Sequence, residues 1–381
     1  MEMYNKPNKL ESVLFIFEQN HTFFQPLIDA IIKYKCLYKY FIFDPKTSTE
    51  LNSKLEYIVN INKIQTIFVC GEYFFNLRIL SNLKNIFLIR LGGDDDIFYN
   101  IYTRNIASYF NINITTSFET AIKLKEEKVE CILIPILYSQ LSFNNKYIYK
   151  YDLTFCGKVG IKHNRSEFLN SLKNNYNIKV FGSDIPGNYL SYTEMMTLYK
   201  QSKINLNFSG IDSNKINITK ITGEDFTKKK QLKGRIFEVL QAGGFLLTEN
   251  SPGIENYFDD GIHLVIFNNQ YELEKQVNYY LTNDHEREKI RLEGFNYVKK
   301  YSIENYISTL ILDIEKSTTI SFPKTKITKM YSKYIGQTLA NNEKFNFINL
   351  NTSYNSNATN FYIYYMLRKN IGKFVKHFFN T

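Results

Sequence analysis

The segment KGRIFEVLQAGGFLLTENSPGIENYF, residues 233–258, stands out from a chain rich in Asn, Ile, Lys, Tyr and Phe. It contains a basic pair, a single glutamate, two adjacent glycines and a short apolar run that ends in Thr-Glu-Asn. The pattern predicts a helix over residues 234–242, which the glycines end, and then a buried strand over residues 244–248. A helix that leads directly into a buried strand is a unit of a parallel sheet covered by helices.

The same alternation of apolar runs and amphipathic stretches extends in both directions from this segment. Before it, with intervening helices of which 117–128 is the clearest, strands are predicted at residues 13–17, 40–43, 66–70, 86–90 and 131–135. From DLTFCGK onward, strands are predicted at residues 153–156, 179–181, 204–208, 244–248 and 264–267. The helices of this second part are predicted at residues 165–174, 193–200, 234–242, 271–281 and 284–301.

Two α/β units in succession predict two Rossmann-like, doubly wound domains that face each other across a cleft, with ligands bound at the carboxyl ends of the strands. The predicted parts are an N-terminal domain (1–147), a C-terminal domain (148–319) and a basic, aromatic extension (320–381). No predicted strand is followed by G-x-G-x-x-G, which argues against a Rossmann dehydrogenase.

The net charge of +10 is concentrated in the extension, which has nine Lys and Arg and one acid, Glu343, and so carries +8. The rest of the chain is close to neutral, which argues against a general nucleic-acid binder. The extension is expected to lie on an anionic membrane surface or to pack back on the N-terminal domain.

The composition indicates a globular protein, with 44% hydrophobic and 22% charged residues. The N-terminus lacks the pattern of a signal peptide, and no apolar run reaches the length of a membrane span. We therefore expect a cytoplasmic protein that is soluble or peripheral on the inner face of the membrane. No pair of cysteines has metal-binding or redox spacing, which predicts buried thiols at Cys36, Cys70, Cys131 and Cys156.

The chemistry is predicted to reside in the helix that begins the quoted segment. Lys233 and Arg235 flank its N-terminus, where free N–H groups and the helix dipole favour an anion such as a diphosphate. Glu238 lies about one turn further on, where a carboxylate can accept hydrogen bonds from the vicinal hydroxyls of a ribose. The pattern predicts a nucleotide-diphosphate site; the alternative is a surface helix with solvated charges.

The stretch GRIFEVLQAGGFLLTE resembles the C-terminal domain of GT-B glycosyltransferases, most closely the spore maturation protein CgeB-like group. LTFCGKVGIKHNRSEFLNSL is also similar to that group, with Arg165 at the usual Arg position, as is IRLGGDDDIFYN, an Asp-rich turn in the N-terminal domain. The resemblance covers residues 85–310. It implies a GT-B fold with an N-terminal acceptor domain and a C-terminal donor domain.

The resemblance implies transfer of a sugar from a nucleotide-diphosphate sugar, UDP- or GDP-linked, to a glycan, protein or lipid-linked acceptor, without a metal or another cofactor. The candidate donor-binding residues are Lys158, Arg165, Lys233, Arg235, Glu238, Gly243 and Gly244. Many retaining members have two glutamates, and Lys230 occupies the position of the first. This departure leaves open how the sugar is held and whether its configuration is retained, and it favours an alternative: a non-catalytic nucleotide-binding or assembly protein.

Candidate catalytic residues follow two predicted strands of the N-terminal domain. Asp94, Asp95 and Asp96 come after a strand and a glycine pair, where Asp94 or Asp96 is expected to act as a general base or to bind an acceptor hydroxyl. The alternative is a solvated acidic turn. His21 follows the first strand, where inverting GT-B enzymes place a catalytic base; the alternative is a structural histidine in a loop. The remaining histidines form no constellation, and no metal site is predicted.

Overall fold

The computed structural model describes residues 9–16, 25–35, 39–43, 51–70, 85–93, 95–138, 148–159, 165–182, 184–211 and 229–317. The predictions for His21, for Asp94 and for the extension 320–381 fall outside these ranges.

The N-terminal domain is built on a six-stranded sheet with the strand order β2-β1-β3-β4-β5-β6, in which every neighbouring pair is parallel. All described residues of the four central strands are buried, as expected of a parallel sheet covered on both faces. The strands are β1 (Ser12–Ile16), β2 (Lys39–Phe43), β3 (Thr66–Cys70), β4 (Phe87–Gly92), β5 (Ile112–Thr115) and β6 (Cys131–Leu133).

Parallel pairing requires crossover connections, and helices lie in each described connection of this sheet; the one between β3 and β4 falls outside the described ranges. The helices are α1 (Gln25–Lys35), α2 (Leu51–Asn62), α4 (Asp95–Phe98), α5 (Arg104–Ile106) and α6 (Phe118–Glu126). A π-helical turn (Tyr99–Thr103) joins α4 to α5, so the Asp-rich turn leads directly into a helical segment. Ser117 caps α6 by accepting a hydrogen bond from the backbone N–H of Thr120.

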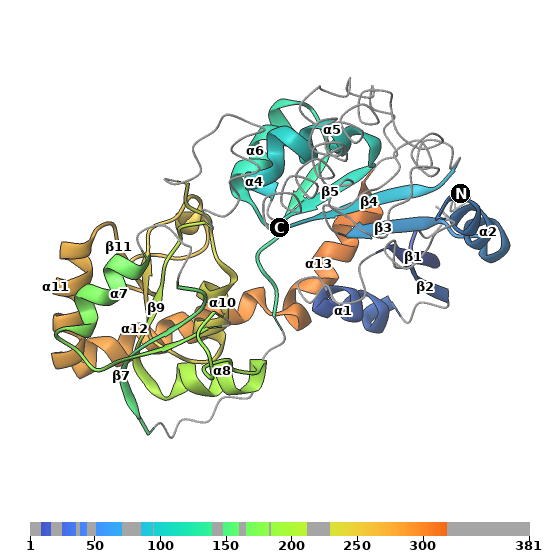
Figure 1. Cartoon of the computed structure of the whole chain (residues 1–381). Coiled ribbons are helices and arrows are strands. Elements are labelled where there is room, and N and C mark those ends of the chain that lie inside the picture. The colour runs from blue at the N-terminus through green and yellow to red at the C-terminus, as the bar shows by residue number, and fades with distance from the viewer. Residues whose placement is uncertain are drawn as a thin grey trace, which may run out of the picture.

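The C-terminal domain is built on a five-stranded parallel sheet with the strand order β11-β10-β9-β7-β8. The strands are β7 (Tyr151–Cys156), β8 (Ile178–Phe181), β9 (Ser202–Asn207), β10 (Leu246–Glu249) and β11 (Val265–Phe267). The helices are α7 (Arg165–Lys173), α8 (Tyr192–Lys200), α10 (Gly234–Gln241), α11 (Gln270–Thr282), α12 (Asp284–Val298) and α13 (Ile303–Lys316). The two parallel, helix-covered sheets confirm the predicted fold class (Figure 1).

The chain passes between the domains at two places that lie side by side. In the first connection, Ile134 and Leu137 pack into the N-terminal core, whereas Ile136 and Tyr138 pack against the C-terminal core. The second connection leads into α13, whose first backbone N–H, that of Ile303, donates to the carbonyl of Tyr138 over 3.1 Å. Tyr138, which lies in the first connection, is therefore hydrogen-bonded to the start of the helix that follows the second connection.

Helix α13 returns to the N-terminal domain and lies beside α1 (Figure 1). Its apolar stripe packs into the same core as β1, β3 and β4, through Ile303, Ile307, Leu310, Ile311 and Ile314. The N-terminal domain is thus completed by a helix that follows the C-terminal domain in sequence.

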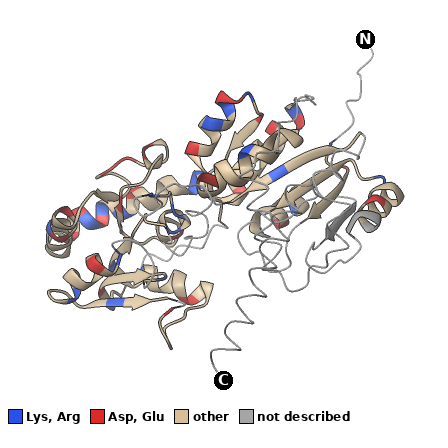
Figure 2. Ribbon diagram, turned by 45° about the horizontal axis from the view of Figure 1, so that its top comes forward, with Lys and Arg blue, Asp and Glu red and all other residues tan. Residues whose placement is uncertain are grey.

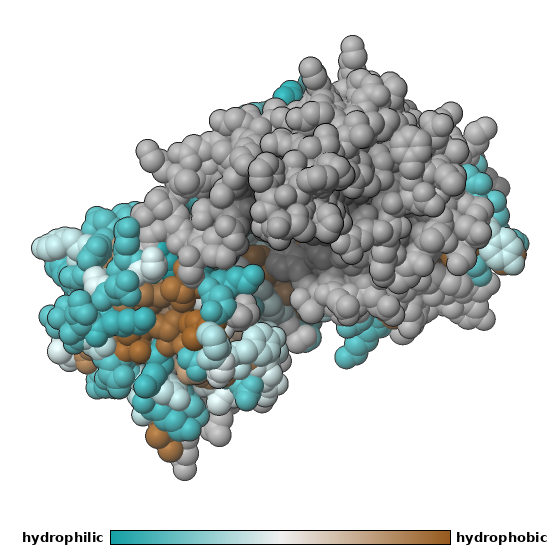
Figure 3. Space-filling model, in the orientation of Figure 1, coloured by the Kyte–Doolittle hydropathy of each residue, from teal (hydrophilic) through white to brown (hydrophobic). Residues whose placement is uncertain are grey.

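Charged residues of both signs occur on the same helices of the described ribbon (Figure 2). On the face shown in Figure 3, apolar residues of the C-terminal domain gather in one area that hydrophilic residues surround. Within the described ranges, every helix is too short or too polar to span a lipid bilayer.

Candidate functional site

The carboxyl ends of the central C-terminal strands and the first turn of α10 converge on one region. Gly157 follows β7, Asn207 ends β9 and Glu249 ends β10. Five of the eight residues of α10 are buried, while Arg235 and Glu238 are half-buried. The helix is therefore anchored in the domain core, and the alternative of a solvated surface helix does not describe it.

Arg235 places a cation at the ends of β7 and β9. Its Nη1 donates to Oδ1 of Asn207 over 3.3 Å, and its guanidinium carbon lies 5.2 Å from the centre of the Phe155 ring. The contact with the ring face and the amide oxygen fixes the plane of the guanidinium. A guanidinium oriented in this way at a strand edge is suited to bind phosphate oxygens.

Gly157 leaves the room that the Arg235 side chain occupies. A Cβ atom at this position would lie 2.6 Å from Nη2 of Arg235 and 3.1 Å from the Phe155 ring. The backbone φ of +155° is also one that other residues rarely adopt. Glycine is required here because the arginine packs directly over the backbone.

Glu238 lies one turn after Arg235 and is bound by a residue from the interdomain connection. The Tyr138 hydroxyl lies over Gly234, on the helix face that Glu238 shares because residues four apart are neighbours on a helix, and it interacts with the Glu238 carboxylate. Burial raises the pKa of Glu238, against the opposing effects of the Arg235 charge and the Tyr138 hydrogen bond. The carboxylate retains acceptor capacity, because it can accept about four hydrogen bonds.

Arg165 and Lys158, both predicted to bind phosphate, are placed differently from Arg235. Arg165 is 2% exposed, and its guanidinium donates to the backbone carbonyls of Lys158 and Phe208. In this position it ties the ends of β7 and β9 together. Lys158 is exposed beside it. Their predicted contacts with a phosphate remain predictions.

Lys233 is the N-cap residue of α10 and donates from Nζ to Oε1 of Gln231 over 2.6 Å. Gly243 and Gly244 lie at the opposite end of this helix. The Gly243 carbonyl accepts a hydrogen bond from Arg291, and a Cβ atom at Gly244 would lie 2.7 Å from Nδ2 of Asn205. These two glycines serve the close approach of the helix end to the sheet, and they lie away from the strand carboxyl ends.

The two described aspartates of the Asp-rich turn, Asp95 and Asp96, are buried and not solvated. Asp95 is 1% exposed, forms an ion pair with Arg90 and accepts a hydrogen bond from Thr103 over 3.0 Å. Asp96 is 5% exposed and accepts a hydrogen bond from Nε2 of Gln231 over 3.0 Å, while its backbone carbonyl accepts one from Lys229. Asp95 therefore supports the N-terminal domain, and Asp96 faces the C-terminal domain.

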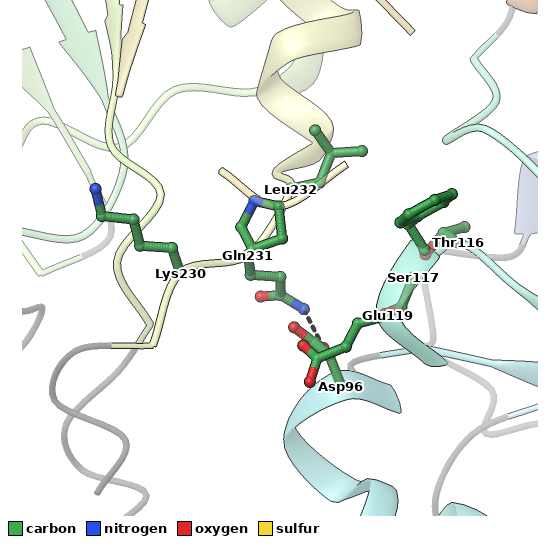
Figure 4. Close-up of a pocket in the computed structure, with 9 residues that line it drawn as sticks. Asp96, Thr116, Ser117, Glu119, Lys230, Gln231 and Leu232 are labelled. Carbon is green, nitrogen blue, oxygen red and sulfur yellow. Dashed lines mark hydrogen bonds between the residues drawn. The ribbon is translucent and has the colours of Figure 1, made fainter. Parts of the chain in front are cut away.

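A small pocket lies between the domains at this contact (Figure 4). It has a volume of about 20 Å³, room for about one water molecule. Its lining residues are Asp96, Thr116, Ser117, Phe118, Glu119, Lys230, Gln231, Leu232 and Pro252. In this conformation the two domains are closed on each other at Asp96.

Lys230, at the position where retaining relatives carry their first glutamate, pairs with an acid of its own domain. Its Nζ lies 3.1 Å from Oε1 of Glu249, and the other oxygen of Glu249 accepts the backbone N–H of Ser209 over 2.8 Å. Figure 4 shows the Lys230 side chain pointing away from Asp96. Among the described residues, no three His, Cys, Asp or Glu side chains come together in a way that could hold a metal ion.

Sequence reasoning did not identify Tyr138, Asn207 or Gln231 as part of the site. Asn207 lies one residue before the end of the predicted strand 204–208, and a polar residue near the strand end was the available signal. Tyr138 and Gln231 carry no local signal, because their partners lie about a hundred residues away in the sequence.

Residues 164–311 match the family model described as "Glycosyl transferase-like". No curated protein matches the chain in sequence. Among solved structures, a glycosyltransferase from Rickettsia africae ESF-5 is similar with a TM-score of 0.55 and 11% identity, covering 80% of this chain and 97% of its own.

TarM is similar with a TM-score of 0.50 and 11% identity, covering 69% of this chain; this chain spans 57% of the length of TarM. At these identities the likeness concerns the fold, and it confirms the predicted GT-B architecture. Residues 164–311 of this chain are therefore similar to the glycosyl transferase-like family, within a chain that has a GT-B fold.

Proposed function

We propose that the protein transfers a sugar from a nucleoside diphosphate sugar to the hydroxyl of a glycan, protein or lipid-linked acceptor. The observation that carries the proposal is the pair formed by Arg235 and Glu238, one turn apart on α10 at the carboxyl edge of the sheet. A guanidinium suits a diphosphate and a carboxylate suits the ribose diol next to it. The match of residues 164–311 to a glycosyl transferase-like family supports the same assignment.

The reaction breaks the bond between C1 of the sugar and a phosphate oxygen, whose electron pair stays with the nucleoside diphosphate. A new bond forms between C1 and the acceptor oxygen, and the acceptor proton leaves to a base or to the departing phosphate. Arg235 is positioned to stabilise the charge that develops on the diphosphate. Lys158, Lys233 and Arg165 are the further cations proposed for this role, without a metal ion or another cofactor.

Among the described residues, Asp96 is the candidate for the general base or the ligand of the acceptor hydroxyl, because it lines the interdomain pocket. His21 and Asp94 remain candidates outside the described ranges. This pocket is too small for an acceptor sugar, so access of an acceptor to Asp96 at this place requires the Gln231–Asp96 contact to open.

A second candidate function is a nucleotide-binding or assembly protein without transferase activity. The pairing of Lys230 with Glu249 favours it, since the position of the first family glutamate carries a neutralised cation. Slow hydrolysis of a nucleotide sugar without acceptor separates the two functions, because only an enzyme activates C1.

The test of nucleotide recognition is a thermal-shift screen with UDP, GDP, dTDP, CMP and their sugars, followed by calorimetry of the best ligand. Wild-type protein is expected to bind a nucleoside diphosphate more tightly than its nucleoside. Glu238→Ala is expected to weaken binding by about 2–3 kcal/mol, through loss of hydrogen bonds to a charged group. Unchanged affinity in Glu238→Ala, with a stable fold, would remove Glu238 from the site.

Three finer assignments rest on the sequence and belong to the same proposal. These are the CgeB-like subgroup, a UDP- or GDP-linked donor, and a cytoplasmic location with the extension 320–381 on an anionic membrane surface. Sedimentation with anionic vesicles, with and without the extension, tests the last.

A further inference from the structure

We propose that Tyr138 is a positioning residue for the donor: its phenol holds the Glu238 carboxylate in the orientation that receives the ribose hydroxyls. The inference rests on the proposed function and adds a residue outside the family-matched segment to it. It depends on how Tyr138 is held, on the space around its hydroxyl and on the groups that surround Glu238.

The backbone of Tyr138 is fixed by contacts at the point where the chain crosses between domains. Its carbonyl accepts the N–H of Ile303 over 3.1 Å, and it forms a parallel bridge with Ser302. The neighbouring residues Ile136 and Leu137 are buried in the C-terminal and N-terminal cores, respectively. The phenol therefore reaches Glu238 from a segment held by both domains.

The start of α10 leaves room for the Tyr138 hydroxyl. A Cβ atom at Gly234 would lie 2.4 Å from this oxygen, so any other residue at the first position of the helix would displace the phenol. The hydroxyl thus sits at the helix N-terminus, on the same face of α10 as Glu238, because positions 234 and 238 are i and i+4 neighbours and helical side chains lean toward the N-terminus.

Among the described residues, the titratable groups that interact with the Glu238 carboxylate are one cation and four groups that are neutral near pH 7. They come from α10, the interdomain connection, α8 and β7, and are Arg235, Tyr138, Tyr192, Tyr199 and Cys156. Burial raises the pKa of Glu238, and the Tyr138 hydrogen bond lowers it again. One hydrogen bond from Tyr138 leaves lone pairs for two ribose hydroxyls, since a carboxylate accepts about four.

The pH dependence follows in direction from these contacts. The diol requires the ionised carboxylate, so nucleotide affinity falls as the pH decreases through the pKa of Glu238. Loss of the Tyr138 hydroxyl removes an interaction that favours the ionised form and raises this pKa further. The fall in affinity then begins at a higher pH.

The test is calorimetry from pH 5 to pH 8 on Tyr138→Phe, with UDP, or with GDP, dTDP or CMP where the screen shows that one to bind more tightly. We expect Tyr138→Phe to bind more weakly than wild type at the acidic end of this range and to approach wild type as the pH rises, because its Glu238 carboxylate ionises at a higher pH. Tyr192→Phe is the matched control, because Tyr192 lies near the same carboxylate but its interaction with Glu238 is electrostatic, without a hydrogen bond. Glu238→Gln should show a smaller fall in affinity over this range, limited to the titration of the nucleotide's own terminal phosphate near pH 6, and the difference from wild type assigns the remaining fall to Glu238.

Three results would overturn the inference. An unshifted pH profile in a Tyr138→Phe variant with wild-type melting behaviour would show that the hydroxyl does not act on Glu238. Tighter binding at every pH would show that the hydroxyl competes with the ribose. An equal shift of the pH profile in Tyr192→Phe would show that loss of any phenol hydroxyl near Glu238 has the same effect. Wild-type protein that binds none of the nucleotides would instead refute the proposed function, and this inference with it.

Discussion

Single residues of the site depend on glycines that leave space for larger side chains. Gly157 lies under the Arg235 guanidinium, and Gly234 lies under the Tyr138 hydroxyl. In both cases the crowding atom is the functional end of a neighbouring side chain. A methyl group at either position would collide first with a side chain of the site, rather than with a residue of the hydrophobic core.

Gly157→Ala is expected to displace Arg235 and to weaken nucleoside diphosphate binding about tenfold, with little effect on the nucleoside. The reason is the 2.6 Å approach of Nη2 to the added carbon. Calorimetry with UDP and with uridine, or with the corresponding pair for another base, measures the difference.

Gly187→Ala is the control for backbone strain in this experiment. Gly187 also has a positive φ, +74°, but a Cβ atom there would meet nothing within 4 Å. It should cost about 1–2 kcal/mol of stability and leave both affinities unchanged. If Gly157→Ala weakened the binding of nucleoside and of nucleoside diphosphate equally, the result would show that Arg235 does not bind the phosphates.

At the scale of elements, α13 shows how an amphipathic helix is assigned to a domain. Its buried positions recur with helical spacing and form one stripe, which any apolar surface of suitable shape would cover. The direction of the chain at Ser302 turns this stripe toward α1 and the N-terminal sheet. The helix therefore stabilises a domain from which most of the chain separates it.

Leu310→Ala is expected to destabilise the N-terminal domain by about 2–5 kcal/mol, because Leu310 is fully buried against that core. Hydrogen exchange should accelerate in β1 and β3 and remain unchanged in β9. Leu312→Ala is the matched control, since Leu312 lies on the same helix and is 54% exposed. Faster exchange confined to β9, or equal effects of the two variants, would contradict the assignment of α13.

At the scale of the whole molecule, the two domains are joined by paired crossings on one side and by polar contacts at Asp96. Gln231 and Lys229 reach Asp96 across the gap, and Lys229 also lies 4.0 Å from Glu119. Such exposed or half-buried polar contacts contribute little individually. The crossings are fixed by apolar packing, so opening is expected at the Asp96 side.

Gln231→Ala is expected to shift the protein toward an open form, with a larger radius of gyration in small-angle X-ray scattering. Nucleotide affinity should stay unchanged while transfer at low acceptor concentration becomes about threefold faster, since the opening that gives an acceptor access to Asp96 costs about 0.5–1 kcal/mol less. Lys203→Ala is the control, because its ion pair with Asp152 lies within the C-terminal domain. An unchanged scattering profile and rate would show that this contact does not govern closure.

The sequence by itself determined the alternation of strands and helices. A strand buried on both faces of a sheet needs an apolar run and a covering helix needs an amphipathic stretch, and both patterns are local. It predicted β3 at its observed bounds and α10 to within one residue. It did not predict β5, since Asn113 interrupts the apolar run; in the structure its amide donates to the Ala107 and Glu130 carbonyls. A buried amide satisfied by distant carbonyls leaves no periodic signal.

Only the tertiary structure decided which polar residues meet. The sequence located Arg235 and Glu238 on one helix, because residues three apart share a face. That Arg165 binds strand carbonyls, that Asp95 pairs with Arg90, and that Tyr138 reaches Glu238 depends on how the two sheets and their crossings are arranged. Contacts between residues far apart in the chain follow from this global arrangement, which no local pattern encodes.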